Sequence, residues 1–159
     1  MCFSASASFT AAAVLMPLGL YSAHIARRTE QHHYLPLALT PFFFGLQQFI
    51  EGLEWTGLDR GRVEPLTSLA GLGFLFFAYC FWMIWIPWSA WSISRSTDSP
   101  RLQHRLRWVA IVATVIGIGF YLPVLLHPPA VQPAVHSTGR LLYDVSNLHS
   151  ILQIGRAHV

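Results

Sequence analysis

The chain has 159 residues, of which 53% are apolar and only 11% are charged. A soluble domain typically carries about 25% charged residues, so this composition excludes an ordinary soluble protein. The basic residues are all arginines, and the formal net charge is +3. Because most of these arginines lie in short segments between apolar stretches, they indicate membrane-topology signals and not a nucleic-acid-binding surface.

Four apolar stretches follow one another along the chain, at residues 3–25, 34–56, 66–91 and 106–126. Each is long enough, at about 1.5 Å of rise per helical residue, to cross a hydrocarbon core of about 30 Å. A soluble four-helix bundle would carry polar residues at every third or fourth position, whereas residues 74–88 contain no charge. The sequence therefore predicts an all-α polytopic transmembrane helical bundle, with four complete spans and the start of a truncated fifth.

The loops between these stretches predict the orientation of the protein. Loops 26–33 and 92–105 carry an excess of arginine, whereas the charges of loop 57–65 cancel. Since positive loops stay in the cytoplasm, we expect the N-terminus and loop 57–65 outside. No cleavable signal peptide is apparent, because no charged residue precedes the first apolar stretch.

Four polar side chains interrupt the second stretch, and a tryptophan follows them: Gln47, Gln48, Glu51, Glu54 and Trp55. Helical spacing gathers these residues on one side of the predicted span. A carboxylate at the centre of a span costs about 2.5–3.5 kcal/mol, so it normally faces a bundle interior, a partner or a water-filled cavity. We expect Glu51 in the outer half of the membrane, either in a structural hydrogen bond or in binding or catalysis. Glu54 either joins that site or reaches the outer headgroups.

The first stretch begins with small residues at the outer level of Glu51. Small residues one turn apart are typical of a close helix-packing face, here formed by Ser4, Ser8 and Ala12. The alternative is that Cys2 and one serine line the site beside Glu51. Cys80 lies about 20 Å deeper than Cys2, too far for a disulfide, and we expect it to be an inert packing residue.

His127 and His136 follow the fourth stretch on the same outer side. Together with Cys2, Glu51 and Glu54 they form a candidate site for a transition metal such as zinc, whose usual ligands are thiolate, imidazole and carboxylate. Their spacing matches no known metal signature, and solvent-exposed loop histidines are the alternative. Soluble-enzyme motifs such as a Gly-rich phosphate loop or an H-E-x-x-H pair are absent, so the sequence leaves open whether the protein is an enzyme.

Tryptophans recur at every third residue near the inner end of the third stretch: Trp82, Trp85, Trp88 and Trp91. The last two are typical of an aromatic girdle at the membrane interface. A cation-binding aromatic cage is the alternative.

Two motifs resemble an uncharacterised family of bacterial multi-pass membrane proteins. The chain begins MCFSASASF, and residues 41–55 read PFFFGLQQFIEGLEW; members of that family begin MCFSA-x-ASF and carry FG-x-QQ-x-x-EG-x-x-W in the second span. Residues 81–87, FWMIWIP, are similar to its third-span motif. The resemblance implies a bacterial inner (plasma) membrane protein of about seven spans, without an established function. It places in the family pattern Cys2, Ser4, Gln47, Gln48, Glu51 and Trp55, whereas Glu54 has no place in it.

Residues 153–159 read QIGRAHV, and IGRAHV resembles the translation of a common short-read sequencing adapter. We therefore interpret 153–159 as a non-native tail. Residues 1–152 are expected to form a single transmembrane domain, truncated at its C-terminus, that continues in the natural protein.

The polar residues together predict binding or transport of a small polar solute or ion through an outer-facing site around Glu51. Further ligand-binding residues in this hypothesis are Cys2, Ser4, Gln47, Gln48 and Trp55. An alternative is an intramembrane metal-dependent hydrolase, which resembles the alkaline ceramidase and adiponectin-receptor group in architecture only. A third hypothesis is a non-catalytic membrane partner subunit. The expected partners are the lipid bilayer, a solute or ion, and a second copy or another membrane protein, but not nucleic acid.

Overall fold

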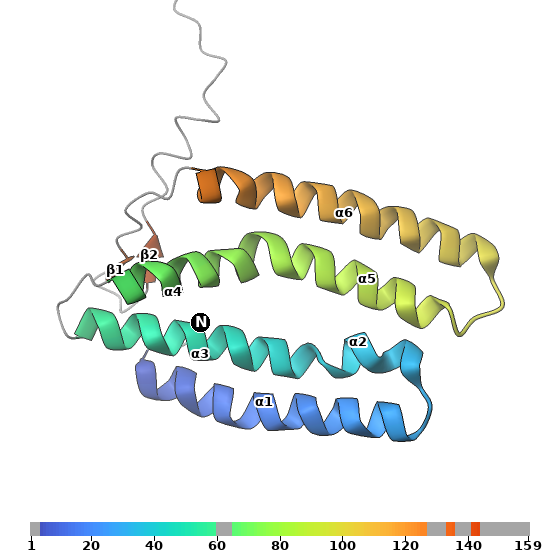
Figure 1. The fold of residues 1–159 in the computed structure, drawn as a ribbon, viewed down its shortest axis with the longest axis horizontal. Coiled ribbons are helices and arrows are strands. Elements are labelled where there is room, and N and C mark those ends of the chain that lie inside the picture. The colour runs from blue at the N-terminus through green and yellow to red at the C-terminus, as the bar shows by residue number, and fades with distance from the viewer. Residues whose placement is uncertain (1–3, 60–64, 127–132, 136–140, 144–159) are drawn as a thin grey trace, which may run out of the picture.

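The structure is a computed structural model that describes residues 4–59, 65–126, 133–135 and 141–143. Almost all of these residues are helical, which confirms the predicted all-α class. The helices form rods that lie side by side in chain order, each antiparallel to the next (Figure 1). The rods make a single layer, so α1 packs mainly on α3 and α6 packs mainly on α5.

The first rod is α1 (Ala5–Arg28), which ends in a tight turn closed by the hydrogen bond from the Gln31 N–H to the Ala26 carbonyl, 2.9 Å long. Glu30 occupies the position of this turn that requires a left-handed backbone, with φ of 58°. Glycine usually fills that position. The turn therefore holds one residue in a conformation that its side chain disfavours.

The second rod consists of η1 (His32–Tyr34), α2 (Leu35–Ala38) and α3 (Thr40–Asp59). The sequence predicted one span over residues 34–56, and the structure interrupts it at Leu39. Pro41 explains the interruption, because its nitrogen carries no hydrogen for a bond to the preceding turn. The longer piece, α3, carries all the polar residues of the predicted span.

The third rod comprises α4 (Pro65–Phe76), a π-helical turn η2 (Phe77–Phe81) and α5 (Trp82–Ser94). A π turn inserts one extra residue into a helix and is frequent at functional sites. Cys80 lies in this turn and is buried, in agreement with the packing role expected for it. The sequence did not predict the π turn.

The fourth rod is α6 (Pro100–Leu126). The predicted start at residue 106 is wrong, because the helix begins at Pro100. Proline is well suited to the first helical position, since its φ is already helical and the N–H it lacks would have no partner there. As a result Arg101 and Arg105 lie on α6 and not in a loop.

Beyond α6 the structure describes a short hairpin, in which β1 (Pro133–Val135) pairs antiparallel with β2 (Leu141–Tyr143). This hairpin was not predicted from the sequence. The predicted start of a fifth span and the tail 153–159 lie outside the described residues.

Three helical segments are long and apolar enough to cross a membrane: Ala5–Arg28, Leu69–Ser94 and Pro100–Leu126. The second predicted span is not among them, because the glutamines and glutamates of α3 lower its hydropathy. The outward face of α6 exposes large apolar side chains, such as Val112 at 52% and Val115 at 66%. These features fit an integral membrane protein.

α1 and α3 approach each other very closely along their whole length. A Cβ added at Gly45 would lie 2.9 Å from the Met16 nitrogen, and one added at Gly52 would lie 2.7 Å from Phe9 Cε1. The buried residues of α1 are correspondingly small: Ser8, Ala12, Gly19, Ala23 and Ala26. Such residues let membrane helices pack backbone to backbone, so the packing alternative holds for Ser8 and Ala12.

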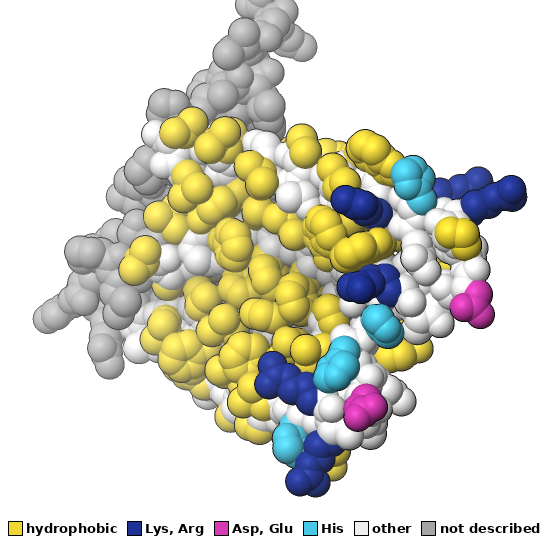
Figure 2. All heavy atoms as spheres, turned by 45° about the vertical axis from the view of Figure 1, so that its right-hand side comes forward, with side chains coloured by type: hydrophobic (Ala, Val, Ile, Leu, Met, Phe, Trp, Pro, Cys, Tyr) yellow, Lys and Arg dark blue, Asp and Glu magenta, His cyan; other side chains and the backbone are white. Residues whose placement is uncertain are grey.

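The exposed charged side chains visible in Figure 2 gather at one end of the layer, where α1 and α5 end and α6 begins. This end carries the turns around Glu30 and Asp98. Loops one and three therefore lie on the same side of the molecule, as the topology prediction requires.

Candidate functional site

The glutamines of α3 lie near its middle and the glutamates in its second half, toward the end of the layer remote from the arginines that the structure describes. Glu51 is only 3% exposed and Glu54 is fully buried at 0%. Their burial agrees with the expectation that a carboxylate in an apolar helix faces inward. Glu54 does not reach the surface, contrary to the alternative in which it contacts headgroups.

Glu51 is held by its own helix. The Gln48 side-chain amide Nε2 donates to Glu51 Oε2 at 2.9 Å, across one helical turn. A hydrogen bond to a charged group is worth about 1.5–3 kcal/mol, which offsets part of the cost of burying the carboxylate. The two residues therefore act as a unit whose geometry is fixed by the α-helical spacing.

Gln47 links α3 to the third rod. The Trp82 indole Nε1 donates to Gln47 Oε1 at 2.7 Å. Since an indole N–H can only donate, the Gln47 oxygen must face Trp82 and its amide group must face the other way. Trp82 is the residue at which the π turn ends and α5 begins. Two neighbouring glutamines of α3 therefore have different partners. Gln48 contacts Glu51, and Gln47 contacts the end of the π turn.

Two further polar atoms are buried where the N-terminal end of α1 lies beside the C-terminal end of α3, and neither has a hydrogen-bond partner: Ser8 Oγ and Trp55 Nε1. Ser8 is 0% exposed and Trp55 is 6% exposed. Phe9 of α1 packs against Gly52 of α3. Both atoms lie within about one helical turn of that contact, because Ser8 precedes Phe9 and Trp55 follows Gly52 by three residues. Buried hydrogen-bond donors and hydroxyls normally have a partner. Ser8 Oγ and Trp55 Nε1 are therefore available to bond a ligand.

Ser4 has a structural task. It is the N-cap of α1, and its Oγ accepts a hydrogen bond from the Ala7 N–H at 3.3 Å. It also lies 3.2 Å from Ser6 Oγ. Both of these contacts are with residues of α1, and the role of Ser4 as a ligand-binding residue stays a prediction.

The metal hypothesis depends on residues that the structure largely leaves out. Cys2, His127 and His136 lie outside the described residues, whereas Glu51 and Glu54 are described and buried. Within the described part of the chain, no group of three or more histidine, cysteine, aspartate or glutamate residues could hold a metal ion. The zinc site stays a prediction.

The row of tryptophans has a function that sequence reasoning missed. Trp85 Nε1 donates to Thr40 Oγ1 at 3.1 Å, and Trp88 Nε1 donates to Thr114 Oγ1 at 2.8 Å. Trp88 therefore joins α5 to α6, in a role that the girdle interpretation did not include. The three-residue spacing of Trp85 and Trp88 was visible in the sequence. It could not identify their partners, because Thr40 and Thr114 are 45 and 26 positions away from them.

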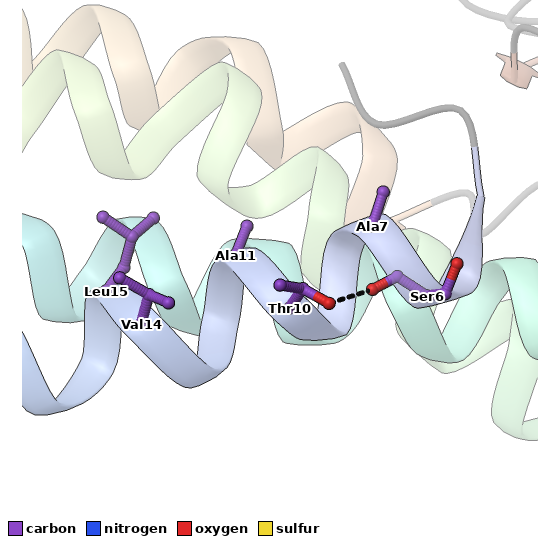
Figure 3. A pocket seen from close by; sticks show the side chains of 6 residues that line it. All are labelled: Ser6, Ala7, Thr10, Ala11, Val14 and Leu15. Atoms are coloured by element: carbon purple, nitrogen blue, oxygen red, sulfur yellow. Dashed lines mark hydrogen bonds between the residues drawn. The ribbon is translucent and has the colours of Figure 1, made fainter.

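A shallow hollow runs along the N-terminal half of α1, lined by Ser6, Ala7, Thr10, Ala11, Val14 and Leu15 (Figure 3). The Thr10 hydroxyl donates to the Ser6 carbonyl at 2.7 Å, so it is engaged within its own helix. The lining is otherwise apolar. This hollow suits an acyl chain or a neighbouring helix better than a polar solute.

No curated protein and no solved structure matches the chain. A family model does match, over residues 1–141, which include every described helix and all the polar residues of α3. That extent agrees with the resemblance seen in the opening motif and in the α3 motif. The chain belongs to the Family of unknown function (DUF6629).

Proposed function

We propose that the protein is a multi-pass protein of the bacterial inner membrane, with all four rods crossing the bilayer and the N-terminus outside. Three of the rods have the length and hydropathy of spans. The α3 rod lies between α1 and α4 and runs alongside both (Figure 1). The arginine-rich turns share one end of the layer, and positive loops remain cytoplasmic.

We further propose that this protein binds or transports a small polar solute or ion, with Glu51 as the ligand for a proton or small cation. The observation that carries the proposal is the burial of Glu51 at 3% exposure with a side-chain amide as its hydrogen-bond donor. The arginines whose side chains are described lie at the opposite end of the rods. A carboxylate placed in this way is costly unless a positive ligand compensates it.

In this proposal each residue around Glu51 has its own role in binding. Gln48 orients the carboxylate, and Gln47, fixed by Trp82, presents its amide group as a hydrogen-bond donor for a polar ligand. Trp55, one turn beyond Glu51, offers the unused indole N–H. The remaining ligand-binding residues of the proposal are Ser4 and Cys2, the latter outside the described residues.

The test is cation binding by the protein in lipid nanodiscs, followed by intrinsic tryptophan fluorescence, because Trp55 and Trp82 border the site. The probes are Na⁺, K⁺, Mg²⁺ and a pH series. We expect at least one probe to give a saturable change in the wild type, and Glu51→Gln to abolish it. Glu30→Gln is the matched control, because it removes an exposed carboxylate from a turn at the other end.

Circular dichroism of the three proteins checks that the helices are unchanged. A wild type that responds to none of the probes would contradict the proposal. So would a Glu51→Gln variant that responds as the wild type does.

A further inference from the structure

A second surface with defined chemistry lies at the end of the molecule opposite to Glu51. It is formed by four side chains of α6, Arg101, His104, Arg105 and Trp108, which we call the α6 basic face. Their spacing places them on one side of the helix over two turns. All four are exposed, Trp108 at 54%, as expected for residues that contact something other than the protein interior.

The α6 basic face presents several hydrogen-bond donors together. The Trp108 indole Nε1 donates to His104 Nε2 at 2.9 Å. Because the indole can only donate, His104 Nε2 must be the acceptor, and in the neutral ring Nδ1 carries the proton. The two arginine side chains lie one turn apart beside this pair. A phosphate group, with several acceptor oxygens and a negative charge, matches such a set of donors.

Beyond Trp108 the same side of α6 becomes wholly apolar. Val112 and Val115 continue the face at helical spacing, and they are 52% and 66% exposed. This order of side chains matches an amphiphile that lies along the helix. The cationic donors would contact its headgroup, the tryptophan would lie at the interface, and the apolar stripe would contact its acyl chain. A free phosphate ion would use only the first part of this surface.

We propose that the α6 basic face binds the headgroup of an anionic phospholipid, whose acyl chain lies along the apolar stripe of α6. Arg101 and Arg105 contact the phosphate and His104 Nδ1 donates to it. The proposal is independent of the Glu51 site, which lies at the other end of the rods. It assigns a bound lipid to a place where the sequence alone indicates only a topology signal.

The experiment counts phospholipid retained by the detergent-purified protein, by native mass spectrometry, after exchange from phosphatidylglycerol or phosphatidylcholine. We expect the wild type to retain phosphatidylglycerol selectively. In Arg101→Gln/Arg105→Gln the retention should fall about 30-fold, since each basic residue near an anionic surface contributes about 1 kcal/mol. The matched control is Arg27→Gln/Arg28→Gln, which removes the same charge from the same end of the molecule but from α1.

Equal losses in the two double variants would overturn the proposal, because they would indicate a diffuse charge effect. Retention of phosphatidylcholine equal to that of phosphatidylglycerol would also overturn it. A third arm adds inorganic phosphate in excess: displacement of the lipid by the ion alone would show that the apolar stripe contributes nothing.

A milder pair keeps the test decisive if the double variant does not fold. Arg105→Gln should lose about 5-fold in phosphatidylglycerol retention, whereas Arg107→Gln, on another side of the same helix, should retain the lipid as the wild type does. Equal behaviour of these single variants would contradict the proposed face.

Discussion

Replacing Gly19 by alanine should destabilise the packing of α1 on α3. A Cβ at this position would lie 2.7 Å from the Phe42 Cα, whereas ordinary contacts begin at 3.4 Å, so the helices would have to separate by at least the difference of 0.7 Å. The obstacle is backbone and cannot rotate away. Overpacking of this kind costs about 1–3 kcal/mol, and the better helix propensity of alanine returns about 0.5–1 kcal/mol. We expect a net loss of up to about 2.5 kcal/mol in the free energy of unfolding.

The matched control is Gly119→Ala in α6, where an added Cβ would have no neighbour within 4 Å. This variant should gain about 0.5–1 kcal/mol from helix propensity alone. The assay is unfolding in mixed micelles with increasing sodium dodecyl sulfate, followed by circular dichroism. Equal unfolding free energies for the two variants would refute the close α1–α3 packing, because alanine would then meet the same surroundings in both places.

Three further substitutions test other contacts by the same unfolding assay. Trp82→Phe removes the indole N–H that Gln47 accepts and should cost about 1–2 kcal/mol, because the amide oxygen loses its partner in a half-buried place. Thr114→Val leaves the Trp88 N–H without its acceptor and should cost about 1–3 kcal/mol. Glu30→Gly should raise stability by up to about 1 kcal/mol, because glycine adopts φ of 58° without steric cost.

Two of these predictions have matched controls. Thr10→Val deletes an exposed hydroxyl bonded only to its own helix, and should change stability by less than about 0.5 kcal/mol. A loss as large as that of Thr114→Val would contradict the interhelical role of Thr114. Glu30→Ala removes the charge but keeps the unfavourable backbone conformation, so a gain equal to that of Glu30→Gly would attribute the effect to charge.

The length and hydropathy of the apolar stretches were sufficient to predict the helical class. The helix ends were harder, because they depend on single residues. Pro100 begins α6 well before the apolar residues do, and Pro41 interrupts a stretch that is apolar throughout its first part. In each case a local backbone constraint outweighs the hydropathy pattern.

The burial of Glu51 was predictable, since a carboxylate in an apolar helix must avoid hydrocarbon. The partner of Gln47 was not, because Trp82 is 35 positions away and the pairing depends on the register between two rods. The π turn changes that register by one residue between α4 and α5. No pattern within residues 77–81 announces the turn, so the contacts of Trp82, Trp85 and Trp88 could not be derived from the sequence.

The most direct measurement of the central claim is the rate at which a lipid-soluble carbodiimide modifies Glu51 in the wild-type protein in nanodiscs, read by mass spectrometry of the modified peptide. If Glu51 binds a proton or cation, the bound cation among Na⁺, K⁺ and Mg²⁺ should slow the modification in a saturable way, and acidification should speed it. A modification rate that stays constant with every cation and at every pH would contradict the assignment of Glu51 as the ligand-binding group.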